Sequence, residues 1–490
     1  MTSHPFLDGT PKQLLIGGRW VDAQGGETFE TRNPATGALL ATIAAASAAD
    51  VDRAVASARE AFETGPWPRF NPSERQRVLL RLADLLERDI ELFAQLDTLE
   101  MGAPIRRTRG GAAMLVDLLR YYAGMARAIQ GETATTADPS LFACTLREPV
   151  GVCGAIIPWN GPLWASILKL GPVLATGCTL VLKPAEVASL APLLLGRLTE
   201  KAGVPAGVFN IVTGTGAIAG AALAAHPGVD KLSFTGSDAT GRAVVAASAG
   251  NLKRLSLELG GKSPHIIFAD ADIPKAAAAA VVAAFGNSGQ VCSAGTRLFV
   301  AREIHDDFTA EVARLAGELR IGDGMDIATD LGPLVSGRQL DRVCGHMDDA
   351  RAAGAGTLSG GGRLTGDGYD AGFFFPPTVL TGATDDMRAV REEIFGPVLA
   401  TLPFDDEAEV IRRANATPFG LGAGVWTRDV GRAHRMGRAL RAGSVWVNCY
   451  NAIDPAVPSG GIKASGYGRE YGRQHLEEHL QTKSLWIGID

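Results

Sequence analysis

The sequence is poor in cysteine. It has six cysteines in 490 residues, and none stands in a CxxC pair or in another spacing typical of metal ligands. A set so sparse argues against a disulfide framework, which stabilises small secreted domains. We therefore expect neither structural disulfides nor a metal site.

Long apolar runs and an excess of basic residues are also missing. The longest apolar stretch, residues 276–285, is mostly alanine, whereas a membrane-spanning helix needs about 20 apolar residues. The first residues lack the basic and apolar regions of a signal peptide. With 47 basic and 53 acidic residues the formal net charge is −6, which argues against nucleic acid or an anionic membrane as a partner. We expect a cytoplasmic protein.

Glycine is abundant, with 60 residues, and short apolar runs alternate with helical segments. At about 100 to 200 residues per domain, the length predicts two to four domains. Five apolar runs separated by Ala- and Leu-rich segments predict βαβ units and a parallel sheet; the runs are 152–157, 179–182, 208–212, 231–234 and 255–259. A second alternating region extends from about residue 266 to residue 448. The sequence thus predicts an α/β protein whose two α/β domains join near residues 258–261.

Two local patterns near the N-terminus predict elements. Gly25-Gly26 lies between the strand-like residues 15–21 and 27–31 and indicates a hairpin. Asn71, with proline next and Glu74 three positions later, indicates a capped helix start.

Two stretches are candidate phosphate-binding loops. Residues 214–219 follow a strand and match the form G-x-G-x-x-A, with Gly216 as the second glycine, but no acidic residue follows about 20 positions later. An ordinary strand–helix turn explains this match equally well. Phe234-Thr-Gly236-Ser237 precedes an expected helix, whose N-terminus would suit a pyrophosphate. A simple helix cap by Ser237 is the alternative.

Lys183 and Glu186 follow directly after another strand. Ligands of parallel sheets bind beyond the carboxyl ends of the strands, so both side chains can hold ribose hydroxyls. A surface loop without a ligand is the alternative.

Three residues are candidates for catalysis. Cys292 lies in a glycine-rich loop; a lone cysteine is usually a small buried residue, but this loop exposes backbone and can present a nucleophile. Glu258 ends an apolar strand, where burial would raise its pKa and make it a base. A structural ion pair with Lys262 is the alternative for Glu258. Asn160, in Pro-Trp-Asn, can offer its amide to an oxyanion.

Together these motifs resemble the NAD(P)-dependent aldehyde dehydrogenase superfamily, over nearly the whole chain and in the family's order. The motifs that carry the resemblance are 33–37, 158–160, 183–186, 234–237, 257–262, 289–292, 392–398, 443–448 and 465–470. The resemblance implies a Rossmann-like cofactor domain, an α/β catalytic domain and a small β oligomerisation ribbon. The corresponding boundaries are 1–125 and 149–258 for the NAD-binding domain, 259–465 for the catalytic domain, and 126–148 and 466–490 for the bridging segments.

The resemblance implies a mechanism. Cys292 attacks the aldehyde to give a thiohemiacetal, whose oxyanion the Asn160 amide and the Cys292 N–H would hold. Hydride passes to the nicotinamide and leaves a thioester, which water activated by Glu258 hydrolyses. Lys169 and Glu470 match positions proposed to relay protons from that glutamate. The other five cysteines are interpreted as packing residues.

The resemblance also implies a cofactor site for NAD, with NADP possible. Lys183 and Glu186 would bind the adenosine ribose, Ser237 and Trp159 the pyrophosphate, and Glu393 with Phe395 the nicotinamide ribose. The further cofactor-binding residues that we expect are Ile156, Gly216, Phe234 and Gly236. The pyrophosphate is thereby expected at Gly236–Ser237 rather than at residues 214–219, and Glu186 favours NAD.

Departures from the family's pattern concern the substrate. Gly161 stands where the family commonly has a large residue, Trp164 follows three positions later, and Ser459 replaces a common phenylalanine. Relatives line the substrate tunnel with the first two positions, so Gly161 would open space and Trp164 would add an aromatic wall. Residues 448–456 are similar to phenylacetaldehyde-type bacterial members, which suggests an aryl-acetaldehyde or a similar hydrophobic aldehyde.

Alternatives remain beside hydrolytic aldehyde oxidation. A relative that passes the acyl group to coenzyme A usually lacks the water-activating glutamate, whereas Glu258 is present here. A catalytically silent scaffold protein and a plain thiol hydrolase fit less well, because both the catalytic and the nucleotide-binding positions are retained. Residues 131–146 and the β-like tail 482–489 fit neither domain and predict a small sheet that leaves the globule. In the family such segments join subunits into a homodimer or homotetramer.

Overall fold

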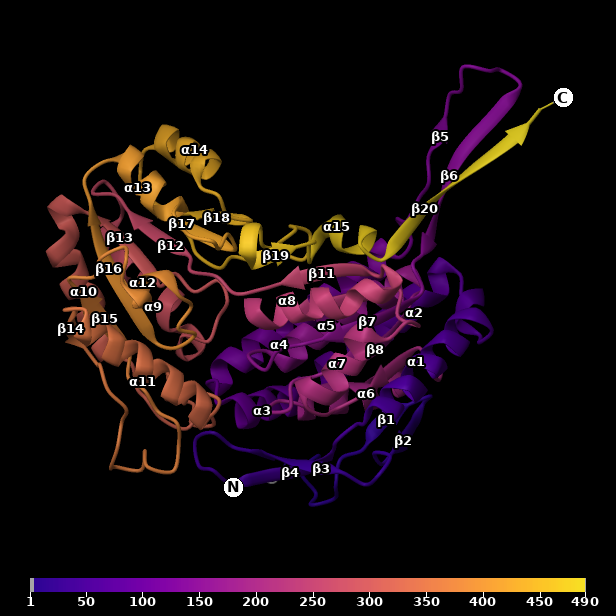
Figure 1. The fold of residues 1–490 in the computed structure, drawn as a ribbon, viewed down its shortest axis with the longest axis horizontal. Coiled ribbons are helices and arrows are strands. Elements are labelled where there is room, and N and C mark those ends of the chain that lie inside the picture. Colours follow the sequence, from indigo (N-terminus) through magenta and orange to yellow (C-terminus); the bar gives the residue numbers. More distant parts are fainter. Residues whose placement is uncertain (1–3, 490) are drawn as a thin grey trace.

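A computed structural model describes residues 4–489 and contains two large sheets with helices on both faces (Figure 1). The first sheet has eight strands in the order β19-β11-β10-β7-β8-β9-β1-β2. Their bounds are β1 (Leu14–Ile16), β2 (Arg19–Val21), β7 (Val152–Ile156), β8 (Thr179–Lys183), β9 (Phe209–Ile211), β10 (Lys231–Thr235), β11 (Arg254–Glu258) and β19 (Gly466–Tyr467). The strands from β11 to β9 pair in parallel, so the parallel sheet predicted from the five apolar runs is confirmed.

Helices cover both faces of this sheet. They are α1 (Ala48–Glu63), α2 (Pro72–Arg88), α3 (Ile90–Met101), α4 (Ile105–Met125), α5 (Pro162–Thr176), α6 (Leu190–Ala202), α7 (Ala221–Ala225) and α8 (Asp238–Ala247). Successive side chains of a strand point to opposite faces: in β7, Cys153 and Ala155 join the core under α2–α6, whereas Val152 and Ile156 join the core under α1, α7 and α8. A strand buried on both faces explains the continuous apolar runs.

The second sheet has seven strands in the order β14-β15-β16-β13-β12-β17-β18. The bounds of its strands are β12 (Pro264–Ile267), β13 (Arg297–Ala301), β14 (Gly356–Ser359), β15 (Thr378–Thr381), β16 (Val398–Phe404), β17 (Gly422–Trp426) and β18 (Ser444–Val447). Its helices are α9 (Ile273–Phe285), α10 (His305–Gly317), α11 (Gly337–Ala352), α12 (Arg388–Arg391), α13 (Glu407–Asn415) and α14 (Val430–Ala439). The chain passes from the first sheet to the second between β11 and β12, and β19 and α15 (Gly472–Glu477) return it to the first.

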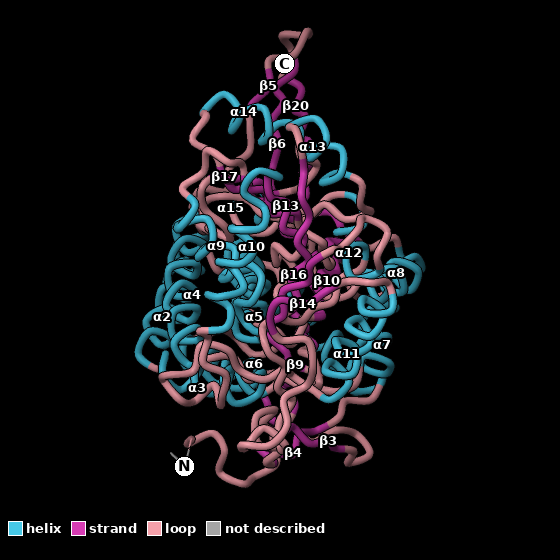
Figure 2. Tube along the Cα trace, turned by 90° about the vertical axis from the view of Figure 1, so that its left-hand side faces the viewer, coloured by secondary structure: helices cyan, strands magenta, loops and turns pink. Residues whose placement is uncertain are grey.

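A three-stranded ribbon projects from the body (Figure 1). It contains β5 (Thr133–Ala134), β6 (Leu141–Pro149) and β20 (Leu480–Gly488), with β6 in the middle and antiparallel pairing throughout. The predicted association of residues 131–146 with the C-terminal tail is therefore confirmed. Figure 2 shows the ribbon at the opposite end of the molecule from β3 (Thr28–Arg32) and β4 (Leu39–Ala44).

The hairpin predicted at Gly25-Gly26 is wrong. The turn lies at Gly17-Gly18, where β1 and β2 pair with Ile16 opposite Arg19. Both of these glycines have positive φ, +61° and +72°, as a two-residue hairpin turn of the primed type requires. Gly25 and Gly26 also have positive φ, but the loop around them separates the strands, and β3 pairs with β4 instead.

The predicted helix start at Asn71 is confirmed. Its side chain accepts hydrogen bonds from the N–H groups of Ser73 and Glu74, and the Glu74 carboxylate accepts from the Asn71 N–H. This reciprocal pair satisfies donors that the first turn of a helix leaves free.

The described residues contain neither a candidate membrane span nor a candidate metal-binding group. Between residues 4 and 489, no helix combines the length and the apolar character that a membrane span requires. Within the same range, no three His, Cys, Asp or Glu side chains are grouped so that they could hold a metal ion.

Candidate active site

The carboxyl ends of four parallel strands bring together residues that are far apart in the sequence. Glu258 ends β11 and lies opposite Thr235 of β10, while Phe234 lies opposite Ile156, which ends β7. Ile156 in turn lies opposite Lys183, the last residue of β8. Ligands of α/β sheets bind at this edge, so the parallel register explains why these candidates share one side of the molecule.

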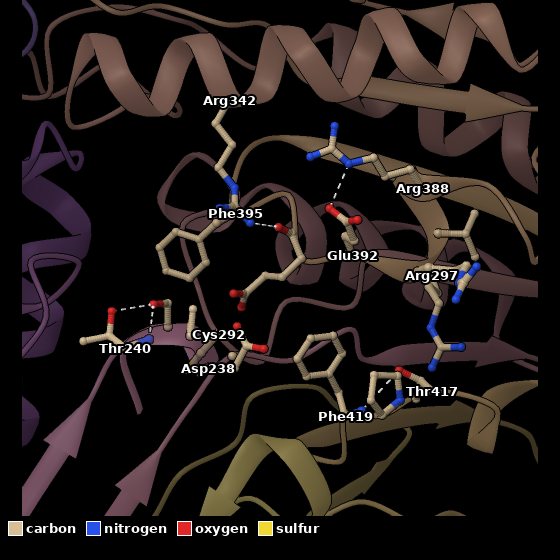
Figure 3. Close-up of a pocket in the computed structure, with 18 of the residues that line it drawn as sticks. Asp238, Thr240, Cys292, Arg297, Arg342, Arg388, Glu392, Phe395, Thr417 and Phe419 are labelled. Carbon is tan, nitrogen blue, oxygen red and sulfur yellow. Dashed lines mark hydrogen bonds and ion pairs between the residues drawn. The ribbon is translucent and has the colours of Figure 1, made fainter. Parts of the chain in front are cut away.

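A cleft of about 1160 Å³ opens beside this edge. It is lined from both sheets, because residues of the first sheet's loops face α11, α12 and the segment 392–395. The predicted site residues that line it are Trp159, Asn160, Gly236, Ser237, Glu258, Cys292, Glu393 and Phe395. Figure 3 draws Cys292 and Phe395 with Asp238 and Thr240 of the α8 N-terminus around this cleft.

The other predicted site residues lie outside the lining of this cleft: Ile156, Gly161, Trp164, Lys169, Lys183, Glu186, Gly216, Phe234 and Glu470. The Lys183 ammonium contacts the Glu186 carboxylate at 3.3 Å. Gly216 begins a short π-helical turn before α7, so residues 214–219 do form a strand–helix turn. Phe234 lies behind Gly236, where an added Cβ would approach the Phe234 ring to 2.6 Å.

Cys292 follows a tight turn that ends at Gly289. Gly289 has φ +68°, and a Cβ there would collide with the carbonyl of Gly396, so only glycine fits. The Cys292 side chain is half-buried. Burial, and then the nearby carboxylates of Glu393 and Glu258, raise the pKa of its thiol to about 12. The thiol is therefore protonated at neutral pH and needs a base before it can act as a nucleophile.

Glu258 has the environment of a general base. Its Oε1 is buried and has no hydrogen-bond partner within residues 4–489. Burial raises its pKa well above the ordinary value, the charge of Glu470 adds to this shift, and the charge of Lys169 opposes it. The alternative ion pair with Lys262 is absent from the described structure, where the Lys262 ammonium is buried and unpartnered. A buried carboxyl oxygen without a hydrogen-bond partner is available for proton transfer.

Asn160 is oriented by the loop that carries Cys292. Its amide nitrogen donates to the carbonyl of Gln290 at 2.9 Å, and its own backbone carbonyl accepts from the Asn287 amide at 3.3 Å. These bonds fix the Asn160 amide against Gln290, which lies two residues before Cys292 in the loop. One N–H of that amide is used here, which leaves the second for an oxyanion.

Lys169 and Glu470 form an ion pair beside this group. Lys169 lies on α5 and is buried, and its ammonium binds the Glu470 carboxylate. The backbone N–H groups of Glu470 and Ser459 each donate to the carbonyl of the other residue at 2.8 Å. These two bonds hold the backbone of Glu470 in place. The pair thus has a fixed position close to Glu258.

The N-terminus of α8 faces the cleft. The Ser237 hydroxyl accepts a hydrogen bond from the Thr240 N–H at 3.3 Å, so the alternative of a helix cap is correct as a description of local structure. Gly236, Ser237 and Thr240 also line the cleft. Free N–H groups at this end and the helix dipole favour an anion, so the cap and a phosphate site are compatible.

Glu393 and Phe395 approach the cleft from the second sheet. The Glu393 carboxylate accepts from the Gly261 N–H at 3.1 Å, and burial raises its pKa to about 7. The Phe395 ring packs edge-on against Trp159, with ring centroids 5.3 Å apart. These contacts connect the two sheets across the cleft.

The sequence analysis missed Gln339 and Arg342, which line the cleft from α11. Gln339 donates to the backbone carbonyl of Phe395 at 2.7 Å, and Arg342 donates to the carbonyl of Glu393. Both therefore hold the loop that presents Glu393 and Phe395. No sequence motif identifies them, because α11 has only the polar and apolar alternation of any surface helix.

Comparisons with known proteins agree with this arrangement. The model of the aldehyde dehydrogenase family matches residues 20–485. The mitochondrial aldehyde dehydrogenase family 2 member B4 of Arabidopsis thaliana is 46% identical over 489 residues, which are 99% of this chain and 90% of that protein.

Two solved structures are also similar. The NAD⁺ complex of an aldehyde dehydrogenase from Bacillus cereus has a TM-score of 0.97 at 44% identity and covers 99% of this chain and 98% of its own. A betaine aldehyde dehydrogenase from Staphylococcus aureus in complex with NAD⁺ has a TM-score of 0.96 at 36% identity, covering 98% of this chain and 95% of its own.

Proposed function

Because the chain belongs to the aldehyde dehydrogenase family, we propose that it oxidises an aldehyde to the carboxylic acid with NAD as the hydride acceptor. The observation that carries this proposal is the convergence of Cys292, Glu258 and Asn160 on one cleft between the two sheets. The test is the formation of reduced nicotinamide by the purified protein with an aldehyde, and its loss in Cys292→Ala.

The side chains have separate roles in this reaction. A base removes the proton of Cys292, and Glu258 is available for this step. The thiolate attacks the aldehyde carbon, and the Asn160 amide with the Cys292 N–H stabilises the oxyanion of the thiohemiacetal. Bound NAD supplies the hydride acceptor. Glu258 then takes a proton from water, which attacks the resulting thioester and releases the acid and the Cys292 thiolate.

Lys169 and Glu470 are proposed to carry the proton away from Glu258. The two charges act on the pKa of that carboxyl in opposite directions: Glu470 raises it and Lys169 lowers it. A proton that passes from Glu258 to Glu470 would leave the number of ionised carboxylates unaltered.

The residues at the sheet edge suit a dinucleotide. The N-terminus of α8, with Gly236 and Ser237, offers free N–H groups to a pyrophosphate, and Trp159 lines the same cleft. Lys183 and Glu186 lie where the adenosine ribose would bind, and the Glu186 carboxylate would repel a 2′-phosphate. Glu393 and Phe395 would bind the nicotinamide ribose. Ile156, Gly216 and Phe234 complete the cofactor site that we propose. NAD is therefore expected to be preferred over NADP, which the NAD⁺ complexes of the two similar enzymes support.

We propose a hydrophobic aldehyde, such as an aryl-acetaldehyde, as the substrate. Gly161 adds no side chain at the start of α5, and Trp164 offers an aromatic surface one turn later. A panel of aliphatic, aryl, amino and semialdehyde substrates, each with NAD and NADP, tests this class by its kcat/KM values.

Transfer of the acyl group to coenzyme A is the second reaction to test. Glu258 favours hydrolysis, because it can activate water next to the thioester. Acyl-coenzyme A among the products of a reaction with added coenzyme A would overturn the hydrolytic assignment, and the free acid would support it.

We also propose that the chain acts as a homodimer or homotetramer in the cytoplasm. Within residues 4–489 the outer edge of β20 pairs with no strand, and an unpaired edge accepts a strand of a neighbouring sheet. The proposed domains are 1–125 with 149–258, and 259–465, bridged by 126–148 and 466–490. Residues 1–3 and 490, which these boundaries include, lie outside the described residues.

A further inference from the structure

Tyr471 has a strained backbone next to the ion-paired Glu470. Its φ is +59° and its ψ is 178°, a region that residues other than glycine rarely occupy. The side chain is 4% exposed. Such a conformation persists only where the surroundings impose it. The contacts of Tyr471 therefore show which groups its strained backbone positions.

Hydrogen bonds on both sides of the peptide between Glu470 and Tyr471 fix its position. The Tyr471 N–H donates to the Nδ1 of His475 at 3.3 Å, and the Tyr122 hydroxyl is hydrogen-bonded to the same nitrogen at 2.7 Å. On the preceding side, Glu470 is bonded to Ser459 in both directions. The peptide between Glu470 and Tyr471 therefore cannot turn without breaking several buried hydrogen bonds.

The side chain of Tyr471 contacts Trp164, which lies outside the lining of the cleft that holds Cys292 and which we propose as part of the substrate region. The indole N–H of Trp164 donates to the Tyr471 hydroxyl at 2.7 Å. An indole nitrogen is a donor only, so the phenol oxygen must accept this bond. Trp164 is half-buried and packs over Gly111 of α4, where an added Cβ would lie 3.8 Å from the indole ring. The hydrogen bond to Tyr471 fixes the orientation of the indole ring on this side.

Two consecutive residues thus bind two residues of the same helix. Glu470 holds Lys169 and Tyr471 holds Trp164, both on α5. Burial raises the pKa of Tyr471, and the charges of Glu470, Cys292 and Glu258 add to this shift, which agrees with a phenol close to the reacting groups.

We propose that Tyr471 is a positioning residue that determines specificity for the aldehyde's substituent. Its hydroxyl fixes the Trp164 indole as a wall of the substrate region, and its backbone places Glu470 against Lys169. This inference rests on the proposed function, which has the aldehyde approach Cys292 past Gly161 and Trp164.

The test is a comparison of Tyr471→Phe with the unaltered protein over NAD-dependent oxidation of acetaldehyde, hexanal and phenylacetaldehyde. Loss of one buried hydrogen bond changes an equilibrium by about 5- to 10-fold. We expect the ratio of KM values for phenylacetaldehyde and acetaldehyde to change by that factor, with a smaller change in kcat. Tyr467→Phe, at a half-exposed tyrosine of β19, is the matched control and should leave the ratio unaltered.

Trp164→Phe removes the same hydrogen bond from the other side. If the bond acts as proposed, the double variant should change the KM ratio no more than the single variants do. An unaltered KM ratio in both single variants, or full additivity in the double variant, would overturn the inference about Tyr471. Failure of the unaltered protein to reduce NAD with any aldehyde would instead overturn the proposed function.

Discussion

The Lys169 ammonium and the Glu470 carboxylate are bonded to each other although 301 positions of the sequence separate them. The pair joins α5 to the segment that returns the chain to the first sheet. Its two charges have opposite effects on the pKa of Glu258, which Glu470 raises and Lys169 lowers. Burial is the largest cause of the raised pKa of Glu258, and the charges of the pair modulate it.

Removal of the Lys169 charge and removal of the Glu470 charge should shift the pH dependence of kcat in opposite directions. Glu258 acts as a base only when ionised, so activity rises as the pH passes its pKa. Lys169→Gln removes the charge that lowers this pKa, and the rising limb should move to higher pH. Glu470→Gln removes a charge that raises it, and the limb should move to lower pH. The measurement is kcat against pH with saturating aldehyde and NAD.

Lys201→Gln, at an exposed lysine of α6, is the control for the loss of a positive charge and should leave the profile in place. Shifts of the two test variants in the same direction would contradict the electrostatic role of the pair.

Cys292→Ala should abolish aldehyde oxidation, with kcat reduced by about 10⁴-fold or more, because no other group can form the thioester. The pKa of the Cys292 thiol, raised to about 12 by burial, leads to a second expectation about its alkylation. In the absence of NAD, inactivation by iodoacetamide should accelerate with pH throughout the range from about 7 to 10, because the thiolate fraction is still rising there.

Steady-state absorbance and mass spectrometry of the alkylated peptide check both expectations. Cys144→Ala, on β6 in the ribbon, is the matched control and should retain activity. Turnover that persists in Cys292→Ala would show that another residue is the nucleophile.

The sequence was sufficient to predict both sheets, the ribbon and eight residues of the cleft lining. The parallel strands could be predicted because their burial on both faces requires continuous apolar runs. Cys292 and Glu258 could be proposed as residues of one site, and both line the cleft, because each stands in an uninterrupted local motif. The turn at Gly17-Gly18 was missed because Gly25-Gly26 is an equally good turn sequence nearby. Only the observed pairing of β1 with β2 decides between the two glycine pairs.

Contacts between distant segments could not be predicted. Gln339 and Arg342 act through hydrogen bonds to the backbone of residues 393–395, which leave no trace in the local sequence. The bond between Trp164 and Tyr471 spans 307 positions and depends on a backbone conformation at Tyr471 that its residue type disfavours.

Glu258→Gln should trap the acyl-enzyme. The amide keeps the shape of the side chain but cannot accept a proton from water, so hydrolysis of the thioester should slow by about 10²- to 10⁴-fold. Incubation with aldehyde and NAD should give a protein whose mass is increased by one acyl group at Cys292, as intact-mass spectrometry would show. Slow thiolate formation in the same variant would appear as a reduced burst of reduced nicotinamide.

Glu87→Gln, at an exposed glutamate of α2 that does not line the cleft, controls for the change of glutamate to glutamine and should accumulate no adduct. Unaltered steady-state turnover in Glu258→Gln would refute the role of Glu258 as the base.

Glu186→Gln should weaken the preference for NAD over NADP. Glu186 is half-exposed, with its carboxylate 3.3 Å from the Lys183 ammonium. Removal of this negative charge leaves Lys183 free to attract a 2′-phosphate, and charges at such distances near a protein surface interact by about 1 to 4 kcal/mol. We expect the ratio of kcat/KM for NADP to that for NAD to rise about tenfold, through KM rather than kcat. Glu303→Gln, at an exposed glutamate outside the cleft, should leave the ratio unaltered. An unaltered protein that already prefers NADP, or a Glu186→Gln variant with an unaltered ratio, would place the adenosine ribose away from Glu186.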